Sequence, residues 1–507
     1  MRIAGEAILG TIVLFGWLVG CAQTPEKSFT SHRSDLSAAE AETAKPPHIV
    51  FFLNDDLGWA DVACYGHPFH RTPNIDRLAG EGLRFTHAYS NGPNCAPSRA
   101  SLMTGQTSPR HGILTVNSSA RGKSVNRRLI PIPNIRTLAD EAVTLAEVLT
   151  TAGYTCAHLG KWHLGADPTT QGFGINIGGT HRGHPKSYFS PYQNPALPDG
   201  PDGEYLTDRL TDEALGILET HDPAQPLFLH FSYFSVHTPI QAPAALRDKI
   251  LARLRAEHDA ATNHGAPPKR GATPKHRAAP GLARRAAYAA MVETVDRSIG
   301  RVVAKLESLG LAEDTLVIFA SDNGGHGGIT SMAPLRGAKG MLYEGGIRVP
   351  LILRWPGRIE TGECAEPVIG CDLPVTLAAL GRSQPLSAWP NPSDGVDLSP
   401  LFTGRPLSTR SLHWHFPAYL AATSRARGIW RTTPAGAIRS GRYKLLEFFE
   451  DSRTELYDLI ADPGETMDIS TRESDRAIAM LDELRRWRRS VGAQVPTERN
   501  PEYQPEH

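Results

Sequence analysis

The chain has 507 residues, which is enough for one large α/β domain and a smaller second one. It carries 53 Lys and Arg residues against 53 Asp and Glu residues, so no net positive charge argues for binding to nucleic acid. Its six cysteines are too few and too scattered for a disulfide framework, although Cys364 and Cys371 are close enough in sequence to pair. Any basic patch must therefore be local.

The N-terminal segment indicates export. The apolar run over 7–19 is shorter than the ~20 residues of a membrane-spanning helix, so it predicts a signal peptide at 1–20. It ends in Leu18-Val19-Gly20-Cys21, which resembles a bacterial lipobox. This resemblance implies lipidation of Cys21, a polar tether over 21–45, and a periplasmic or outer-membrane-anchored bacterial lipoprotein that contacts the membrane only through its lipid. The alternative is plain secretion after cleavage near Ala22.

A pair of acidic residues follows the first strand that the pattern predicts. The continuous apolar run over 48–53 is typical of a buried parallel strand, and Asp55 and Asp56 come directly after it. Ligands in open α/β sheets gather at the carboxyl ends of strands, so the pair is well placed to bind a metal. The alternative is a solvated turn capped by its own acidic side chains.

The segment 94–105 reads Asn-Cys-Ala-Pro-Ser-Arg-Ala-Ser-Leu-Met-Thr-Gly. Pro97 fits the first turn of a helix, where free N–H groups and the helix dipole favour an anion. A nucleophile at Cys95 would therefore meet a negatively charged substrate. Taken alone, the same spacing also fits a buried structural cysteine.

Basic and imidazole side chains follow the next two predicted strands. The pattern predicts a short helix over 144–152 and strands over 154–159 and 226–231. The side chains that follow these strands are Lys161, His163 and His237. Taken alone, Lys161 fits an exposed lysine, and His237, which precedes a Thr-Pro pair, fits a capped turn.

A second acidic strand end lies beyond a loop and a long helix. The Pro-, Gly- and Ala-rich stretch 256–281 predicts a surface loop, and apolar residues at helical spacing predict a packing helix over 282–309. The apolar run 316–320 then predicts a strand that ends in further oxygen donors. Donors without His or Cys suit a hard cation, Ca²⁺ before Mg²⁺, and argue against Zn²⁺. The expected donors at one sheet edge are Asp55, Asp56, Asp322 and Asn323.

The last third of the chain changes to shorter elements. Lys339 comes first, and Glu344 and Arg348 are expected to form a structural ion pair. The elements then expected are a strand over 351–355, an antiparallel hairpin formed by 441–447 and 455–459, and a packing helix over 476–490.

Several of these motifs together resemble the type I sulfatases, in which a cysteine is oxidised to formylglycine after translation. The first signature is carried by Cys95, Pro97, Ser98, Arg99, Leu102, Thr104 and Gly105. Others are Gly160-Lys-Trp-His-Leu-Gly165, Gly337-Ala-Lys-Gly340 and Glu344-Gly-Gly-Ile-Arg-Val-Pro350. The resemblance covers about 46–490. It implies an alkaline-phosphatase-like α/β fold: a large mixed sheet sandwiched by helices over 46–380, with a C-terminal subdomain of antiparallel strands and a helix over 381–507.

The resemblance also implies a role for each matching residue. The formylglycine made from Cys95 would be the nucleophile and a ligand of the metal, and Arg99 would orient it. Lys161 and Lys339 would bind the sulfate. His237 would protonate the leaving oxygen, and His163 would act as the base for sulfate release. The residues expected to hold the metal are Asp55, Asp56, Cys95, Asp322 and Asn323.

An aldehyde suits this chemistry because its hydrate carries two hydroxyls on one carbon. One hydroxyl attacks sulfur, and deprotonation of the other then breaks the C–O bond, expels sulfate and regenerates the aldehyde. A serine nucleophile would instead leave a sulfate ester about as hard to hydrolyse as the substrate.

The resemblance implies a sulfated carbohydrate as substrate and a formylglycine-generating enzyme as maturation partner. His181 and Arg182 are candidates for sugar contacts, with an ordinary surface loop as the alternative reading. Two other functions remain open at this point. One is a phosphonate or phosphate ester hydrolase of the same fold, and the other is a glycan-binding lipoprotein with a dead site.

Overall fold

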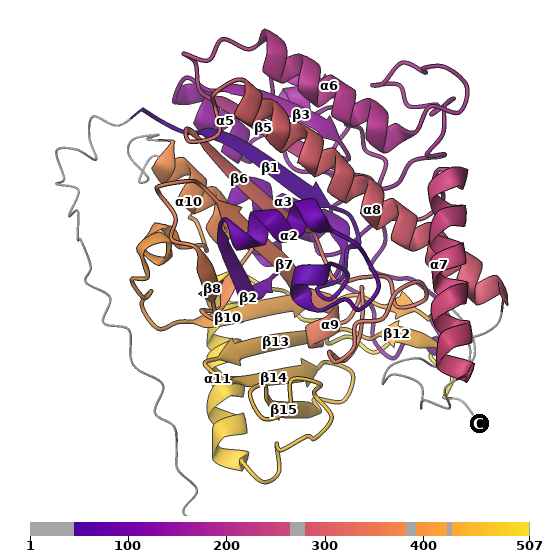
Figure 1. Ribbon diagram of the computed structural model, residues 1–507. Helices are drawn as coiled ribbons and strands as arrows, with labels where there is room; N and C mark the ends of the chain where they lie inside the picture. The colour runs from indigo at the N-terminus through magenta and orange to yellow at the C-terminus, as the bar shows by residue number, and fades with distance from the viewer. Residues whose placement is uncertain (1–44, 264–278, 382–391, 423–427, 506–507) are drawn as a thin grey trace, which may run out of the picture. The chain divides into compact units, whose positions relative to one another are not determined.

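A mixed nine-stranded sheet carries the site. A computed structural model describes residues 45–263, 279–381, 392–422 and 428–505 (Figure 1). The strand order is β4-β3-β5-β1-β6-β7-β2-β8, with β9 also paired to β2. The first five strands are mutually parallel, and β7 runs antiparallel between β6 and β2. The strands are β1 (His48–Asn54), β2 (Leu83–Tyr89), β3 (Thr155–Gly160), β4 (Ile175–Ile177), β5 (Leu227–Ser232), β6 (Thr315–Ser321), β7 (Arg348–Arg354), β8 (Gly362–Cys364) and β9 (Val368–Ile369).

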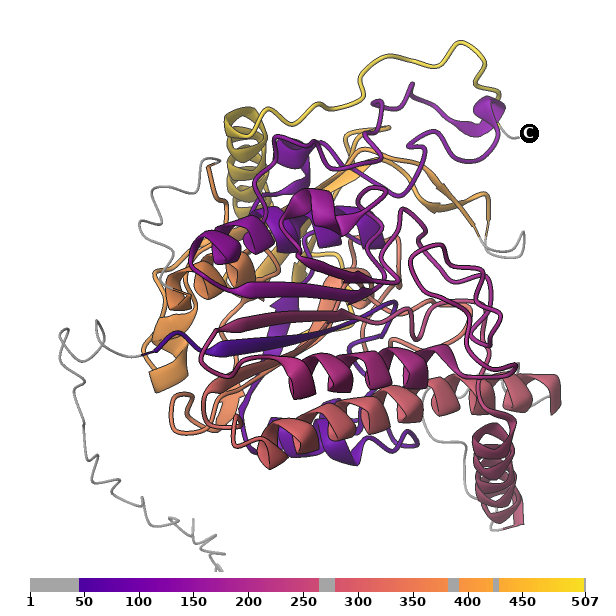
Figure 2. The ribbon, with the colours of Figure 1, turned by 90° about the horizontal axis from the view of Figure 1, so that it is seen from above.

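Helices cover both faces of this sheet, and Figure 2 shows them on either side of the layer of strands. Alternate residues of β1 point to opposite faces: Val50 and Phe52 pack into one hydrophobic cluster, and Ile49, Phe51 and Leu53 into another. The first cluster includes α2 (Pro73–Gly80), α6 (Leu206–Thr220), α7 (Ala244–Asn263) and α8 (Ala279–Ser308). The second includes α3 (Cys95–Thr104), α5 (Leu145–Thr151) and α10 (Asp372–Leu380). The sandwich expected from the sequence is confirmed.

A smaller antiparallel sheet follows near the C-terminus, in the order β10-β13-β14-β15. The hairpin expected over 441–459 is its β14–β15 pair, and the last helix, α11, packs against the sheet. A separate two-stranded ribbon, β11–β12, was not predicted. The elements are β10 (Ser411–Phe416), β11 (Leu420–Ala421), β12 (Trp430–Thr432), β13 (Ala435–Ser440), β14 (Tyr443–Phe448), β15 (Thr454–Asp458) and α11 (Ser474–Ser490).

One sequence expectation is wrong in part. The stretch 256–281 was expected to be a loop, but α7 continues to Asn263 and α8 begins at Ala279. Alanine and charged residues with good helix propensity outweigh the turn signals at both ends of this stretch. Its middle part lies outside the described residues. The remaining short helices of the described segments are α4 (Ser108–His111), α9 (Glu344–Ile347) and 3₁₀ helices at Ala63–Tyr65, Ser124–Asn126, Pro168–Gln171 and Ser399–Thr403.

The expectations for the N-terminal segment stay predictions. The signal peptide, the tether and Cys21 lie outside the described residues. Within the part of the chain that the structure describes, no helix is both long and apolar enough to span a bilayer. Cys364 and Cys371 are both free thiols, so the pairing considered for them is not formed.

A buried charge cluster joins the C-terminal sheet to the segment beside the site. Lys444 of β14 lies 3.0 Å from Glu344 and 2.9 Å from Glu465, and all three side chains are fully buried. The expected pair of Glu344 with Arg348 is confirmed at 3.7 Å, and the Tyr89 hydroxyl donates to Glu344 at 2.7 Å. Removal of one charged partner would leave the others buried without their full counter-charge in a medium of low dielectric constant. The cluster is therefore sensitive to substitution.

We expect Lys444→Ala to lower the free energy of unfolding by about 3–5 kcal/mol, because buried Glu465 loses its cation and buried Glu344 keeps only Arg348. Urea titration followed by circular dichroism measures this loss. The control is Arg476→Ala, which removes a partly exposed i,i+3 pair with Glu473 and is expected to cost less than about 1 kcal/mol. Equal losses in the two variants would contradict the assignment.

Candidate active site

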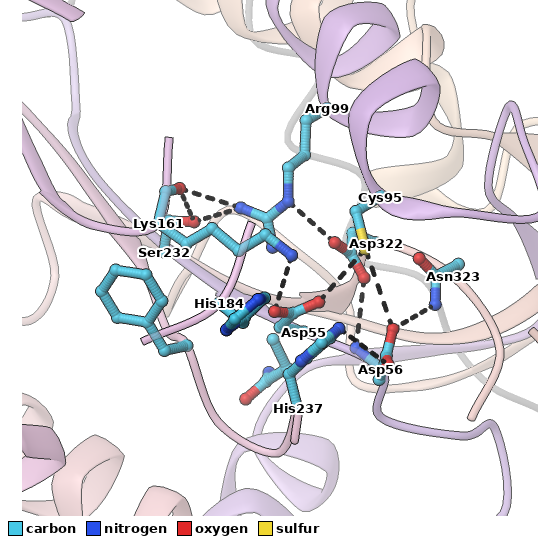
Figure 3. Close-up of polar contacts among 12 residues, drawn as sticks. Asp55, Asp56, Cys95, Arg99, Lys161, His184, Ser232, His237, Asp322 and Asn323 are labelled. Carbon is cyan, nitrogen blue, oxygen red and sulfur yellow. Dashed lines mark hydrogen bonds and ion pairs between the residues drawn. The ribbon is translucent and has the colours of Figure 1, made fainter. Parts of the chain in front are cut away.

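The carboxyl ends of four neighbouring strands, β3, β5, β1 and β6, converge on one cluster of polar side chains (Figure 3). The four expected oxygen donors lie together there and are fully or almost fully buried. The Asp56 N–H donates to Asp322 Oδ1 at 3.2 Å, and Asn323 Nδ2 donates to Asp56 Oδ1 at 2.8 Å. Asp56 has a left-handed backbone with φ of 61°, a conformation that a non-glycine residue keeps only where its surroundings impose it.

Cys95 is the first residue of α3 and points into this cluster. Its Sγ lies 3.5 Å from Asp55 Oδ1 and 3.1 Å from Lys339 Nζ. Burial raises the pKa of the Cys95 thiol to about 12, although Lys161 and Lys339 favour the thiolate. The unmodified thiol is therefore neutral near pH 7, unlike the low-pKa cysteines that act as nucleophiles directly.

Arg99 lies one turn further along α3 and ties the helix to three strand ends. It donates to Asp322 Oδ2 at 2.8 Å, to the Lys161 carbonyl at 2.9 Å and to Ser232 Oγ at 2.5 Å. Burial opposes its charge, but Asp322 and Asp55 outweigh burial and raise the pKa of Arg99. Within the described part of the chain, Arg99 forms no hydrogen bond with Cys95, so it positions α3 through Asp322 and the strand ends.

The two expected sulfate-binding lysines both point at carboxylates. Lys161 Nζ lies 2.7 Å from Asp55 Oδ2, and Lys339 pairs with Asp56. With Arg99 and Asp322, the centre contains three cationic and three acidic side chains, so its formal charge is balanced. A divalent cation would shift that balance to a positive value and favour an incoming anion.

The donor atoms fit a hard cation. Asp56 Oδ2 and Asn323 Oδ1 are buried and have no hydrogen-bond partner among the described residues. Such orphaned acceptors each cost about 1–3 kcal/mol unless a ligand satisfies them. Asp55, Asp56, Cys95 and His237 also offer ligand atoms that all lie within 4.8 Å of one another. Carboxylate and amide oxygens are the ligands that Ca²⁺ and Mg²⁺ prefer.

Two histidines border the cluster. His163 has a left-handed backbone with φ of 66°, and burial lowers its pKa well below the usual range, so it is a neutral base. His237 Nδ1 lies 2.8 Å from the Thr238 carbonyl, which leaves Nε2 facing Asp56 Oδ2 at 3.6 Å. Burial lowers the pKa of His237 as well, although Asp55 and Asp56 favour its charged form. The His184 ring stacks on it at 5.9 Å.

A cavity of about 510 Å³ opens above the cluster, a volume typical of ligand sites. Cys95, His163, His237 and Lys339 line it near the cluster, and the walls include His181 and Arg182, the two residues suggested for sugar contacts. The sequence interpretation missed several other lining residues, because they come from loops and from the unpredicted β11–β12 ribbon. These are Asn94, Val116, Asn117, Arg121, Lys186, Leu420 and Arg431.

Comparisons with known proteins agree with this geometry. The family model described as Sulfatase matches residues 47–381, and one described as N-sulphoglucosamine sulphohydrolase, C-terminal, matches 338–489. Arylsulfatase A from Homo sapiens is 35% identical, with 85% of each chain covered. N-acetylgalactosamine-6-sulfatase from Canis lupus familiaris is 32% identical, with 75% of this chain and 71% of that protein covered. The solved structure of Ps i-CgsB in complex with k-i-k-neocarrahexaose has a TM-score of 0.69 and 27% identity, and covers 90% of this chain and 95% of its own.

The mixed α/β sheet carries a charge-balanced centre at its strand ends, and the matching family model identifies the class of protein as a hydrolase. The chain is a member of the sulfatase family, and it is therefore a sulfuric ester hydrolase. The mixed sheet and its C-terminal antiparallel companion, both expected from the sequence, match those of solved sulfatases.

Asp56→Asn is expected to weaken Ca²⁺ binding at least about tenfold, because it removes charge from the donor set that holds an unpartnered oxygen. Titration calorimetry on chelator-treated protein measures the affinity, with Asp222→Asn on an exposed turn as the control. Equal affinity in the wild type and the Asp56 variant would place the cation elsewhere.

Proposed function

We propose that the protein hydrolyses a sulfate ester of a carbohydrate, with a formylglycine made from Cys95 and a bound divalent cation, Ca²⁺ before Mg²⁺. The observation that carries this proposal is the position of Cys95, between Lys339 and Asp55 at the bottom of the cavity. Its raised pKa also supports the proposal, because a neutral buried thiol is a poor nucleophile until it is converted.

The cation would be held by Asp55, Asp56, Asp322 and Asn323, and it would supply positive charge that polarises the sulfate oxygens. Lys161 and Lys339 then bind the other sulfate oxygens as compact charges within the same cluster. A cation that shares Asp55 and Asp56 with these lysines would weaken both ion pairs and leave the two ammonium groups for the substrate.

The two histidines divide the proton transfers. A hydroxyl of the hydrated aldehyde gives its proton to Asp55, whose Oδ1 lies 3.5 Å from Cys95 Sγ, and forms a bond to sulfur. The bond from sulfur to the sugar oxygen breaks, and His237, in the charged form that Asp55 and Asp56 favour, gives that oxygen a proton. His163 next takes the proton from the second hydroxyl. The C=O bond re-forms, the C–O bond to sulfate breaks and inorganic sulfate leaves, after which water hydrates the aldehyde again.

A carbohydrate substrate is supported by the names of two relatives. N-acetylgalactosamine-6-sulfatase is named for an amino sugar, and the Ps i-CgsB structure holds k-i-k-neocarrahexaose. The many polar lining residues of the cavity also suit hydroxylated rings.

The modification is tested by peptide mass spectrometry on enzyme produced with a formylglycine-generating enzyme. We expect residue 95 to be an aldehyde in the active protein, and Cys95→Ala to lose at least about 10³ in kcat. Cys364→Ala, at a partly exposed free cysteine, is the control. Full activity with unaltered cysteine at 95 would contradict the proposal, as would faster hydrolysis of an aryl phosphate than of the matched aryl sulfate.

The role of His237 is tested with two leaving groups. We expect His237→Gln to lower kcat/KM by about 10²–10⁴ for a sugar sulfate, whose alkoxide needs a proton, and far less for nitrophenyl sulfate. Steady-state sulfate release with both substrates measures the ratio. An equal loss with the two substrates would contradict a role as general acid.

A further inference from the structure

The walls of the cavity carry one sign of charge. Sixteen residues line the cavity, and none of them is Asp or Glu. Beyond Lys339, which belongs to the sulfate-binding centre, the lining cations are Arg121, Arg182, Lys186 and Arg431. A cavity lined by a single sign of charge focuses its field on ligands of the opposite sign.

Three of these cations have only neutral acceptors. Arg121 donates to the Val116 carbonyl. Arg182 Nη1 donates to the Gln193 carbonyl at 2.5 Å, and Lys186 Nζ donates to Gln193 Oε1 at 3.0 Å. Within the described residues, these three side chains form no ion pair with a carboxylate, so their charge is left for a ligand.

Charged arginines elsewhere in the chain behave differently. Arg297 and Arg301 on α8 form ion pairs with Asp208 and Asp212 of α6, although all four side chains are well exposed to solvent. Arg121, in contrast, is partly buried, and burial lowers its pKa. A partly desolvated guanidinium without a carboxylate gains most from an anionic ligand.

The charged walls are part of the site. Gly183, next to Arg182, packs so closely on the catalytic base that a Cβ there would lie 2.5 Å from His163 Cε1. On the other wall, Arg121 lines the same cavity as Cys95. Both walls therefore lie beside the reacting centre.

We infer that this cavity binds a second anionic group of the substrate, and that the natural substrate is a polyanionic glycan. The inference rests on the proposed function and narrows its substrate class. The walls bind a carboxylate or a further sulfate carried by the same sugar or its neighbour. The binding side chains are Arg121 on one wall and Arg182 and Lys186 on the other. The sulfate to be cleaved is bound by Lys161 and Lys339 at the base of the cavity.

The experiment compares three disaccharides that share one scaffold and one cleavable sulfate. The first has no other charge, the second has a carboxylate, and the third has a second sulfate. We expect kcat/KM to be at least about tenfold higher for one or both of the anionic disaccharides than for the first. The two arms identify which anion the walls prefer. An uncharged disaccharide that reacts as well as both anionic ones would overturn the inference.

Substitutions of the wall arginines test whether the walls cause the preference for an anionic disaccharide. Arg121→Gln and Arg182→Gln are each expected to lower the ratio of kcat/KM between the better anionic disaccharide and the uncharged one by about tenfold. Arg358→Gln, at an exposed arginine outside the cavity, is expected to keep the ratio. Unchanged ratios in both wall variants would overturn the inference.

The same assays separate this inference from the proposed function. Nitrophenyl sulfate has a leaving group without a sugar or a second anion. If the converted enzyme releases sulfate from it but shows no preference among the disaccharides, only the inference fails. If the converted enzyme releases sulfate from no substrate, the proposed function fails and the inference fails with it.

Discussion

The buried ion pair between Arg99 and Asp322 is the constraint on which the site depends. It joins α3, which carries Cys95, to the end of β6, which is followed by Asp322 and Asn323. The same guanidinium holds the Lys161 carbonyl and Ser232, so the ends of β3 and β5 are fixed relative to Cys95 as well. A single side chain thereby sets the distance between the reacting residue and the groups that bind its substrate.

Charge balance explains why so many ionised groups can be buried together. Each cation in the centre faces a carboxylate, and the φ of 61° at Asp56 turns its carboxylate toward Lys339 and Asn323. Above this balanced centre, the cavity walls carry positive charge without a carboxylate among the lining residues. The protein thus keeps its uncompensated charge where a ligand can reach it and not in its core.

The sequence predicted the strand ends well for a physical reason. A buried parallel strand is a continuous apolar run, and β1 and β6 pair in a register that sets Asn54 beside Ser321, so the acidic residues after them must meet. The roles of Cys95, Lys161 and His163 came from long motifs and not from their local patterns. His237 and Lys339 stand in shorter motifs and depended most on the family resemblance.

The cavity walls could not be predicted in the same way. Arg121 and Lys186 lie in irregular loops, whose course depends on contacts far away in the sequence, such as the packing of Gly183 on His163. Arg431 comes from a short ribbon without a clear alternation of apolar and polar residues. The end of α7 was wrongly predicted to be a loop, because its turn residues were given more weight than the helix propensity of their neighbours.

The balanced charge of the centre has a consequence for the order in which ligands come and go. A dication held by Asp55 and Asp56 and an oxyanion held by Lys161 and Lys339 would each reduce the repulsion felt by the other, so their binding free energies would be coupled. Such coupling is reciprocal: the anion tightens the hold on the dication by the same factor by which the dication tightens the hold on the anion. Inorganic sulfate, as the product, would therefore protect the enzyme against chelators while it slows turnover.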